Sequence, residues 1–324
     1  MIDNEITIVT AFYDIGRKDI KNFERDNDKY LSYFEFLAGI KNKMIIYTQE
    51  NIKEKILDTR KKHNLEDKTI IITKELQEFD EQGYKKIIDT FKDYNQGINR
   101  KNPNNIECIS PMYCYLMYLK PFFVCDAIEE GLTNENIMWL DFGFNHGGEF
   151  FIDKEQFNFL LEKQNGIDND KINFFSIKDD DRQTLASIYF SMETFIMGGL
   201  IFANYKKWQI FKDDLKKSLD CFSSLGMIDD DQIMLLWCFR NYPQNYNAIR
   251  VYFWFDCLYY FIPQNIAKKL KINTNQIKYY KIIKEKLKED FNNKNIKNTF
   301  INLIKYCYFK FVGGKIKCNH RKIK

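Results

Sequence analysis

Near its start the chain reads Glu5-Ile6-Thr7-Ile8-Val9-Thr10-Ala11-Phe12, a β-branched and apolar run without alternating polar residues. Such a run is typical of a strand that is covered on both faces, as in a parallel sheet. A second strand is predicted at residues 43–48, an amphipathic helix at 51–63 and a third strand at 69–73. This strand, helix and strand form a βαβ unit, which indicates an α/β protein with parallel strands.

The rest of the chain continues to alternate between helix and strand patterns. Buried strands are predicted at residues 137–140 and 172–177, and at 194–202, where Gly198-Gly199 marks a bulge or a close backbone approach. Two aromatic strands are predicted at 251–255 and 259–262, and helices at 82–94, 110–131 with a break at Pro121, 154–164, 205–223 and 230–240. The sequence therefore predicts an α/β domain over residues 1–265 and a helical C-terminal extension over residues 266–324.

Composition narrows the class of protein. In 324 residues, 49 Lys and Arg stand against 45 Asp and Glu, and a net charge of +4 argues against a dedicated nucleic-acid binder. An apolar content of 45% excludes wholesale disorder. The cysteines form no CxxC pair, so we expect free thiols in a reducing cytosol. No apolar run is long enough to predict a signal peptide or a membrane span.

The loop that follows the first strand is the first candidate site. In an open α/β sheet, ligands bind beyond the carboxyl ends of the strands. Between Thr10 and Arg17, the exposed backbone amides and the side chains of Asp14 and Arg17 could hold a base, a ribose and a phosphate. In the alternative interpretation, Asp14 and Arg17 pair with each other in an ordinary loop.

A second candidate loop reads Asp141-Phe142-Gly143-Phe144-Asn145-His146-Gly147-Gly148 and follows the buried strand at residues 137–140. A carboxylate at the end of a strand, followed by glycines, suits a hard cation such as Mg²⁺ or Mn²⁺. His146 could be a metal ligand, a proton carrier or a sugar contact. Alternatively, Asp141 caps a turn and His146 is a solvated loop residue.

Three further features carry charge. Asp229-Asp230-Asp231-Gln232 open a helix, where carboxylates act as caps, but three acids exceed what a cap needs, so Asp230 or Asp231 could serve as a general base. Lys120, in an apolar helix, either reaches the surface or pairs with an anion. The run Asp179-Asp180-Asp181 is predicted to be a solvated loop.

Several common motifs are absent from the sequence. It has no GxGxxG, GxxxxGK[ST], GxSxG or HExxH, which argues against Rossmann dehydrogenases, P-loop enzymes, α/β-hydrolases and zincins. Aromatic side chains such as Trp208, Trp254 and Tyr259 could stack on sugars, although most aromatic residues are expected to be core.

Taken together, these residues resemble a known family. The run Ile6-Thr7-Ile8-Val9-Thr10-Ala11-Phe12-Tyr13-Asp14-Ile15-Gly16-Arg17 resembles the opening of the bacterial HtrL/YibB-like, or WlaTB-like, glycosyltransferase family. The order and spacing of three later features agree with it: the helix from Tyr113 to Lys120, Trp139-Leu140-Asp141-Phe142-Gly143, and Gly198-Gly199 followed by Asp230-Asp231-Gln232. The resemblance implies a GT-A-type fold, a Rossmann-like mixed sheet flanked by helices.

The resemblance also implies roles for individual residues. Asp230 or Asp231 would be catalytic, His146 and Gln232 would contact the acceptor, and His320 in the basic tail could close over the diphosphate. The usual metal motif of such enzymes has two aspartates, and here only Asp141 is present. The resemblance therefore implies Mn²⁺ or Mg²⁺ with Asp141 as its only identified ligand. The nucleotide and donor sugar would be bound by Thr10, Ala11, Phe12, Asp14, Arg17, Lys120, Asp141, Gly143, Gly198 and Gly199.

The expected function is that of a hexosyltransferase-like enzyme, which moves a sugar from a UDP- or GDP-linked donor to a hydroxyl of a bacterial surface glycan or glycolipid. One alternative is a non-catalytic carbohydrate- or partner-binding protein on the same fold. Another is a nucleotidyltransferase, which would need at least two clustered metal-binding carboxylates. We expect a cytoplasmic protein without a nucleic-acid partner, whose basic tail at residues 310–324 touches the inner membrane weakly.

Overall fold

The computed structural model describes residues 5–146, 157–164, 166–180, 182–251, 254–269, 287–288, 291–292 and 296–312. The chain divides into two units, Met1–Pro263 and Gln264–Lys324. The second unit contains the helices α10 (Gln264–Lys269) and α12 (Ile296–Val312), the described part of the predicted helical extension. The tail beyond residue 312, with His320, lies outside the described residues. Within the described part, no helix is long and apolar enough to cross a membrane.

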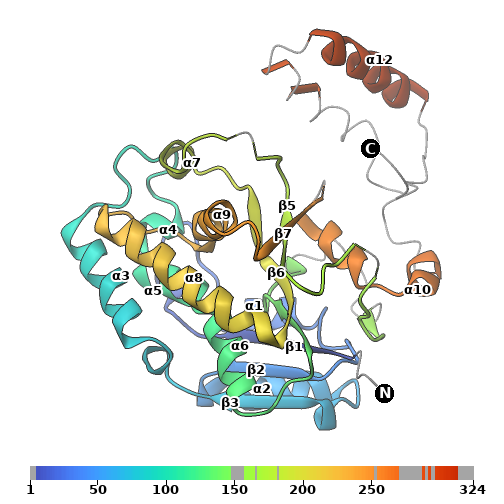
Figure 1. Ribbon diagram of the computed structural model, residues 1–324. Helices are drawn as coiled ribbons and strands as arrows, with labels where there is room; N and C mark the ends of the chain where they lie inside the picture. Colours follow the sequence, from blue (N-terminus) through green and yellow to red (C-terminus); the bar gives the residue numbers. More distant parts are fainter. Residues whose placement is uncertain are drawn as a thin grey trace. The chain divides into compact units, whose positions relative to one another are not determined.

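The first unit is built on a mixed sheet (Figure 1). Its strands are β1 (Ile6–Phe12), β2 (Met44–Thr48), β3 (Thr69–Thr73), β4 (Asn136–Leu140), β5 (Ile172–Ser176), β6 (Ile196–Asn204) and β7 (Tyr246–Arg250). The seven strands lie in the order β3-β2-β1-β4-β6-β5-β7. The first four are parallel, β6 is antiparallel to both β4 and β5, and β7 is parallel to β5. The predicted α/β class, with a Rossmann-like mixed sheet, is confirmed.

Helices flank this sheet. They are α1 (Asn27–Phe34), α2 (Glu50–Lys61), α3 (Glu81–Asp93), α4 (Ile106–Ile109), α5 (Pro111–Tyr118), α6 (Lys120–Glu129), α7 (Leu185–Ser191), α8 (Tyr205–Ser224) and α9 (Asp231–Asn241). α6 packs against β1 and β4, α8 and α9 pack against β6, and α2 packs against β3 (Figure 1). Ile8 and Val9 point to opposite faces of β1, and both are fully buried. The unbroken apolar pattern of β1 therefore reflects cover on both faces.

The order of the strands reverses between β1 and β4. From β1 the sheet extends through β2 and β3 on one side, and β4 is added later on the other side of β1. Because β1 and β4 are parallel, with Val9 opposite Trp139, their carboxyl ends lie at the same edge of the sheet. In open α/β sheets, ligands bind in the crevice beside such a reversal.

Pro121 divides the helix predicted at residues 110–131. α5 ends at Tyr118, and Pro121 lies in the first turn of α6, where a missing N–H breaks no helical hydrogen bond. The prediction of two abutting helices is confirmed. The break places Lys120 at the first position of α6, where it is only 2% exposed.

The two aromatic strands predicted at residues 251–255 and 259–262 are wrong over their described residues, which are 251, 254–255 and 259–262. Trp254–Tyr260 form a 3-10 helix, and the strand beside β5 is the preceding segment, β7. The side chains of Cys257, Leu258 and Phe261 are fully buried. A spacing of three to four residues between buried side chains belongs to a helical turn, and the density of aromatic residues hid this period in the sequence.

The helix predicted at residues 154–164 is also wrong over its described part. Residues 158–164 form no helix, because their backbone groups bond to other loops. The amide of Leu161 donates to the side chain of Asn42 at 2.6 Å, and the amide of Glu162 donates to the carbonyl of Phe261 at 2.7 Å. These partners are distant in sequence, so no local pattern could predict this loop.

Candidate functional site

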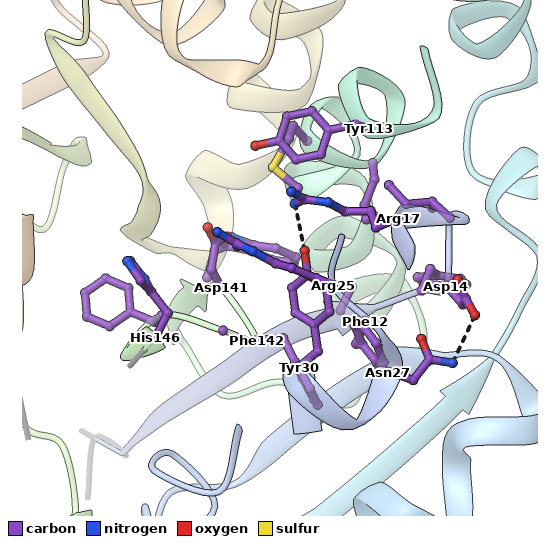
Figure 2. A pocket seen from close by; sticks show the side chains of 18 of the residues that line it. Phe12, Asp14, Arg17, Arg25, Asn27, Tyr30, Tyr113, Asp141, Phe142 and His146 are labelled. Carbon is purple, nitrogen blue, oxygen red and sulfur yellow. Dashed lines mark hydrogen bonds between the residues drawn. The ribbon is translucent and has the colours of Figure 1, made fainter. Parts of the chain in front are cut away.

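A pocket of about 240 Å³ opens where β1 and β4 end (Figure 2). It lies at the reversal of strand order and is lined by the two loops singled out from the sequence. Of the predicted site residues, it is lined by Ala11, Phe12, Asp14, Arg17, Asp141, Gly143 and His146. Sequence reasoning missed Arg25, Asn27, Tyr30 and Tyr113, because no element was predicted between residues 17 and 43 and most aromatic side chains were expected to be core. Trp254, named as a possible sugar platform, also lines the pocket, whereas Trp208 is fully buried in the core.

The loop after β1 is held by its own backbone. Gly16 has φ +76°, a left-handed conformation that glycine adopts without strain, and its amide donates to Asp14 Oδ1 at 2.9 Å. Asp14 Oδ2 accepts from the side chain of Asn27 at 3.0 Å (Figure 2). The alternative in which Asp14 pairs with Arg17 is therefore not adopted, and the carboxylate orders the loop instead.

Arg17 is the buried cation of this pocket. Its Nη1 donates to the hydroxyl of Tyr30 at 2.7 Å (Figure 2), and its guanidinium lies 5.4 Å from the ring centroid of Tyr113. The side chain is 8% exposed, and its Nε is buried without a hydrogen-bond partner in the described part of the chain. Because a buried guanidinium N–H is costly to leave unpaired, an anionic ligand is favoured beside Arg17.

Aromatic rings form much of the remaining wall. Phe12 and Phe142 stack at 4.9 Å between ring centroids, and Phe142 stacks in turn on Phe34 at 4.3 Å. Tyr30 packs on Phe12 at 5.1 Å. Stacked rings of this kind offer rigid faces for a flat base or for the apolar face of a sugar.

Asp141 connects the pocket to a buried ion-pair cluster. Its Oδ1 accepts from the indole Nε1 of Trp139 at 2.7 Å and lies 3.0 Å from the ammonium of Lys120. The carboxylate side chain is 32% exposed and lines the pocket, whereas Lys120 lies below it and does not. The amide of Asp141 donates to the carbonyl of Gly199 at 2.9 Å, which fixes the loop to β6.

Lys120 is surrounded by oxygen atoms. The carbonyl of Gly198 lies at 2.8 Å, Asp141 Oδ1 at 3.0 Å and Asp231 Oδ2 at 2.6 Å. Burial lowers the pKa of Lys120, but the two carboxylates outweigh it and raise the pKa above its usual value. Burial raises the pKa of Asp231 in spite of the neighbouring ammonium. Lys120 therefore remains charged and pairs with anions of the protein itself.

The glycine pair of β6 makes room for this cluster. A Cβ added at Gly198 would lie 1.7 Å from Asp231 Oδ2, so no larger residue fits while Asp231 stays in place. A Cβ at Gly199 would lie 3.3 Å from the ring of Phe144, a much milder contact. The pairing of β5 with β6 shifts register across this segment, so the prediction of a bulge with a close approach is confirmed.

The remaining predicted site residues lie outside the lining of the pocket. Thr10 is buried beneath it, with an Oγ1 that has no partner in the described residues. Asp230 caps α9, since its side chain accepts from the amide of Gln232 at 3.0 Å. The side chain of Gln232 accepts from Thr194. Asp231 is 4% exposed, so it reaches the pocket only through Lys120 and Asp141.

A divalent cation does not fit the described residues around Asp141. Among them, no three His, Cys, Asp or Glu side chains come together as a metal site. One oxygen of Asp141 already receives an indole N–H and an ammonium. A cation bound to this carboxylate would face the charge of Lys120, which opposes binding.

The sheet order and the position of the pocket define the chain as an α/β protein with a Rossmann-like sheet and a ligand crevice at its strand reversal. The chain belongs to the HtrL_YibB family, described as bacterial protein of unknown function, whose model matches residues 4–263. It is 29% identical over 282 residues to Protein HtrL of Escherichia coli strain K12, which covers 82% of this chain and 95% of that protein. Among solved structures, mouse xyloside xylosyltransferase 1 in its apo form aligns with a TM-score of 0.41 and 10% identity over 76% of this chain and 85% of that one.

Proposed function

We propose that the chain is a glycosyltransferase that takes a sugar from a UDP- or GDP-linked donor and transfers it to a hydroxyl of a bacterial surface glycan. The observation that carries the proposal is the pocket at the reversal between β1 and β4, with Arg17 at one side and Asp141 at the other. A buried guanidinium suits a diphosphate, stacked rings suit a base, and a partly exposed carboxylate suits sugar or ribose hydroxyls. A nucleotide sugar carries all three groups.

In this proposal, the acceptor hydroxyl oxygen attacks the anomeric carbon of the donor and the bond from that carbon to the diphosphate breaks. The electron pair leaves with the diphosphate, where Arg17 and the backbone amides of the β1 loop would stabilise the developing charge. The proton of the acceptor would pass to a carboxylate. Asp230 and Asp231 stay the predicted bases, and no step of this proposal passes through Mn²⁺ or Mg²⁺, because the described residues around Asp141 do not fit a divalent cation.

The first experiment is a thermal-shift screen of the full chain with UDP, GDP, CMP and dTDP, each with and without Mn²⁺ or Mg²⁺. A nucleotide in excess over its dissociation constant raises the melting temperature by mass action. We expect the melting temperature to rise with one nucleotide. Arg17→Met should lower the affinity for that nucleotide by about 10-fold, since an ionic hydrogen bond is worth about 1.5–3 kcal/mol. Lys62→Ala, an exposed charge outside the pocket, is the control and should bind as the wild-type chain does. No shift with any nucleotide would refute the proposal.

One observation favours a second candidate, a non-catalytic carbohydrate-binding protein. Neither Asp230 nor Asp231 lines the pocket, so the described lining holds no carboxylates besides Asp14 and Asp141. The two candidates differ in turnover. A transferase hydrolyses UDP-glucose or another accepted donor slowly without an acceptor, and this release of nucleotide should stop in Asp141→Asn. Binding of a sugar without any nucleotide release would favour the second candidate.

We also propose that α12 and the basic tail contact an anionic membrane surface, where a lipid-linked acceptor would lie. Ile296, Phe300 and Ile304 recur every four residues and fall on one face of the helix, and residues 296–324 contain Lys and Arg but no Asp or Glu. The full chain should sediment with vesicles containing phosphatidylglycerol, less so at high salt, and not with pure phosphatidylcholine vesicles. Equal sedimentation with both kinds of vesicle, or with neither, would contradict this.

A further inference from the structure

Lys120 is enclosed by the protein and has no exposed route to a ligand. It is 2% exposed, and three oxygen atoms lie within 3.0 Å of its Nζ, of which the Gly198 carbonyl accepts a hydrogen bond. Two of the three belong to carboxylates, from Asp141 and Asp231. The ammonium is therefore a fixed part of the site, since turning it toward the pocket would leave two carboxylates without their cation.

The side chain of Asp231 packs directly against the backbone of Gly198 in β6. Its Oδ2 occupies the space that a Cβ of residue 198 would take, 1.7 Å from the built position. The same oxygen lies 2.6 Å from Lys120 Nζ, and the Gly198 carbonyl also accepts from that Nζ. The absence of a side chain at Gly198 thus lets three groups from α6, β6 and α9 converge on one point.

The cluster leaves Asp141 with one engaged and one available oxygen. Oδ1 receives the indole N–H of Trp139 and the charge of Lys120, whereas Oδ2 forms no hydrogen bond within the described residues. The side chain is one-third exposed, in the wall of the pocket. An ionised oxygen held in this way is an acceptor for a ligand group that brings its own proton, such as a hydroxyl.

We infer that Lys120 is a resident cation that takes the place of a divalent metal at Asp141, and that Asp141 accepts a hydrogen bond from a hydroxyl of the bound ligand. The hydroxyl belongs to a polyol, either a ribose or a sugar. This part of the inference rests on the proposed function. The statement about metal does not, because it concerns only the charges of Lys120, Asp141 and Asp231. Lys120 is a positioning residue here, and Asp141 is the residue that touches the ligand.

The metal statement is tested with Mn²⁺ alone, by the loss of its free-ion electron paramagnetic resonance signal on titration with the full chain. The wild-type chain and Asp141→Asn should have the same affinity for Mn²⁺, since any Mn²⁺ that binds would do so away from Asp141. Lys120→Met keeps the length of the side chain and removes its charge, which leaves Asp141 and Asp231 as a carboxylate pair. It should gain a Mn²⁺ site that the double variant Lys120→Met/Asp141→Asn lacks, because a lost ligand weakens affinity by about 10-fold or more.

Two results would overturn the metal statement. One is wild-type Mn²⁺ binding that falls about 10-fold or more in Asp141→Asn, since Asp141 would then be a metal ligand. The other is a folded Lys120→Met that gains no site. If Lys120→Met does not fold, Mn²⁺ binding by the wild-type chain and by Asp141→Asn still tests whether Asp141 is a metal ligand. A purely structural role for Lys120 predicts instability in the variant but no gain of metal binding.

The hydroxyl is identified with UDP, 2′-deoxy-UDP and UDP-glucose as probes, or with the matching set for another nucleotide that shifts the wild-type melting temperature. If Asp141 accepts from the ribose, Asp141→Asn and the missing 2′-hydroxyl weaken binding by similar factors, and the two losses do not add. If it accepts from the sugar, Asp141→Asn weakens only UDP-glucose. Equal binding of all three probes by both proteins would overturn the assignment, whereas no binding of any nucleotide to the wild-type chain would refute the proposed function instead.

Discussion

Two buried cations, Lys120 and Arg100, pair with opposite ends of the acidic run from Asp229 to Asp231, and their surroundings differ. Lys120 pairs with Asp231 and Asp141, at 2.6 and 3.0 Å. Arg100 pairs with Asp229 at 2.7 Å and lies 3.9 Å from Glu107. Both cations are nearly inaccessible, with 2% and 5% exposure. Neighbouring carboxylates thus face separate clusters, and Asp230 between them caps α9.

The clusters differ in what lies beyond them. The Lys120 cluster continues through Asp141 into the pocket. The Arg100 cluster ends on the ring of Tyr189, whose centroid is 3.9 Å from the guanidinium, and Arg100 Nε and Nη1 find no partner in the described part of the chain. The difference lies in the pocket: Asp141 of the Lys120 cluster lines it, which suits a positioning role for Lys120, whereas neither Arg100 nor Tyr189 lines it, which suits the anchoring of a loop. The comparison predicts that Lys120 and Arg100 both stabilise the fold and that only Lys120 affects the affinity for a ligand.

The largest effect is expected from removal of either cation. Lys120→Met and Arg100→Met should each lower the free energy of unfolding by about 3–5 kcal/mol, because breaking a buried ion pair leaves an uncompensated charge. Urea denaturation measures this loss. At a temperature where both variants are folded, Lys120→Met should change nucleotide affinity and Arg100→Met should not. An equal effect of both variants on the ligand would remove the distinction between the clusters.

Asp229 makes the Arg100 cluster sensitive to pH. Burial raises the pKa of Asp229 to about 6, although Arg100 opposes the rise. The folded state therefore holds more protons than the unfolded state between about pH 4 and 6, and stability falls as pH rises through about 6, by up to about 3 kcal/mol.

Asp229→Asn should flatten this decline, measured as urea unfolding at a series of pH values from 4 to 7. Burial also raises the pKa of Asp230 and Asp231, so part of the decline should remain. Asp89→Asn, which changes an exposed carboxylate on α3, is the control and should keep the wild-type slope. A slope that Asp229→Asn leaves unaltered would contradict the protonation of this cluster.

The glycine pair allows a sharper test of the Lys120 cluster alone. Gly198→Ala drives a methyl group into Asp231 and should cost about 1–3 kcal/mol of stability, the usual cost of overpacking. Gly199→Ala meets the ring of Phe144 at 3.3 Å and the indole of Trp254 at 3.5 Å, which are much milder contacts, and should cost less. Thermal unfolding of the two variants measures the difference. Equal losses would mean that the spacing between Gly198 and Asp231 is not a constraint.

The smallest effect is expected from the carboxylate that joins neither cluster. Asp230→Ala removes the cap of α9 and should cost about 1 kcal/mol, within the range for lost N-caps. Asp230→Ser keeps a capping oxygen and should restore most of that stability. If Asp230 is also the catalytic base, Asp230→Ser would be stable but would not transfer sugar, and a donor-hydrolysis assay separates the two roles.

Local pattern predicted much of the fold and part of the site. The six strands from β1 to β6 followed from apolar runs, some of them β-branched, and the break at Pro121 and the bulge at Gly198-Gly199 followed from the special geometry of Pro and Gly. Arg17 and Asp141, which line the pocket, were also predicted from the sequence, because the carboxyl ends of parallel strands meet at one edge of the sheet. The aromatic segment 254–260 was predicted incorrectly, since continuous apolar runs fit a helix and a strand equally well.

By itself, then, the sequence determined the sheet class and the two loops at its edge, since backbone sterics and side-chain burial act over a few residues. Only the tertiary structure decided the partners of each charge. Lys120, Asp141, Gly198 and Asp231 are separated by many residues and converge because α6, β6 and α9 pack together. A buried ammonium is stable only beside carboxylates, and which carboxylates these are depends on packing between elements that no local pattern records.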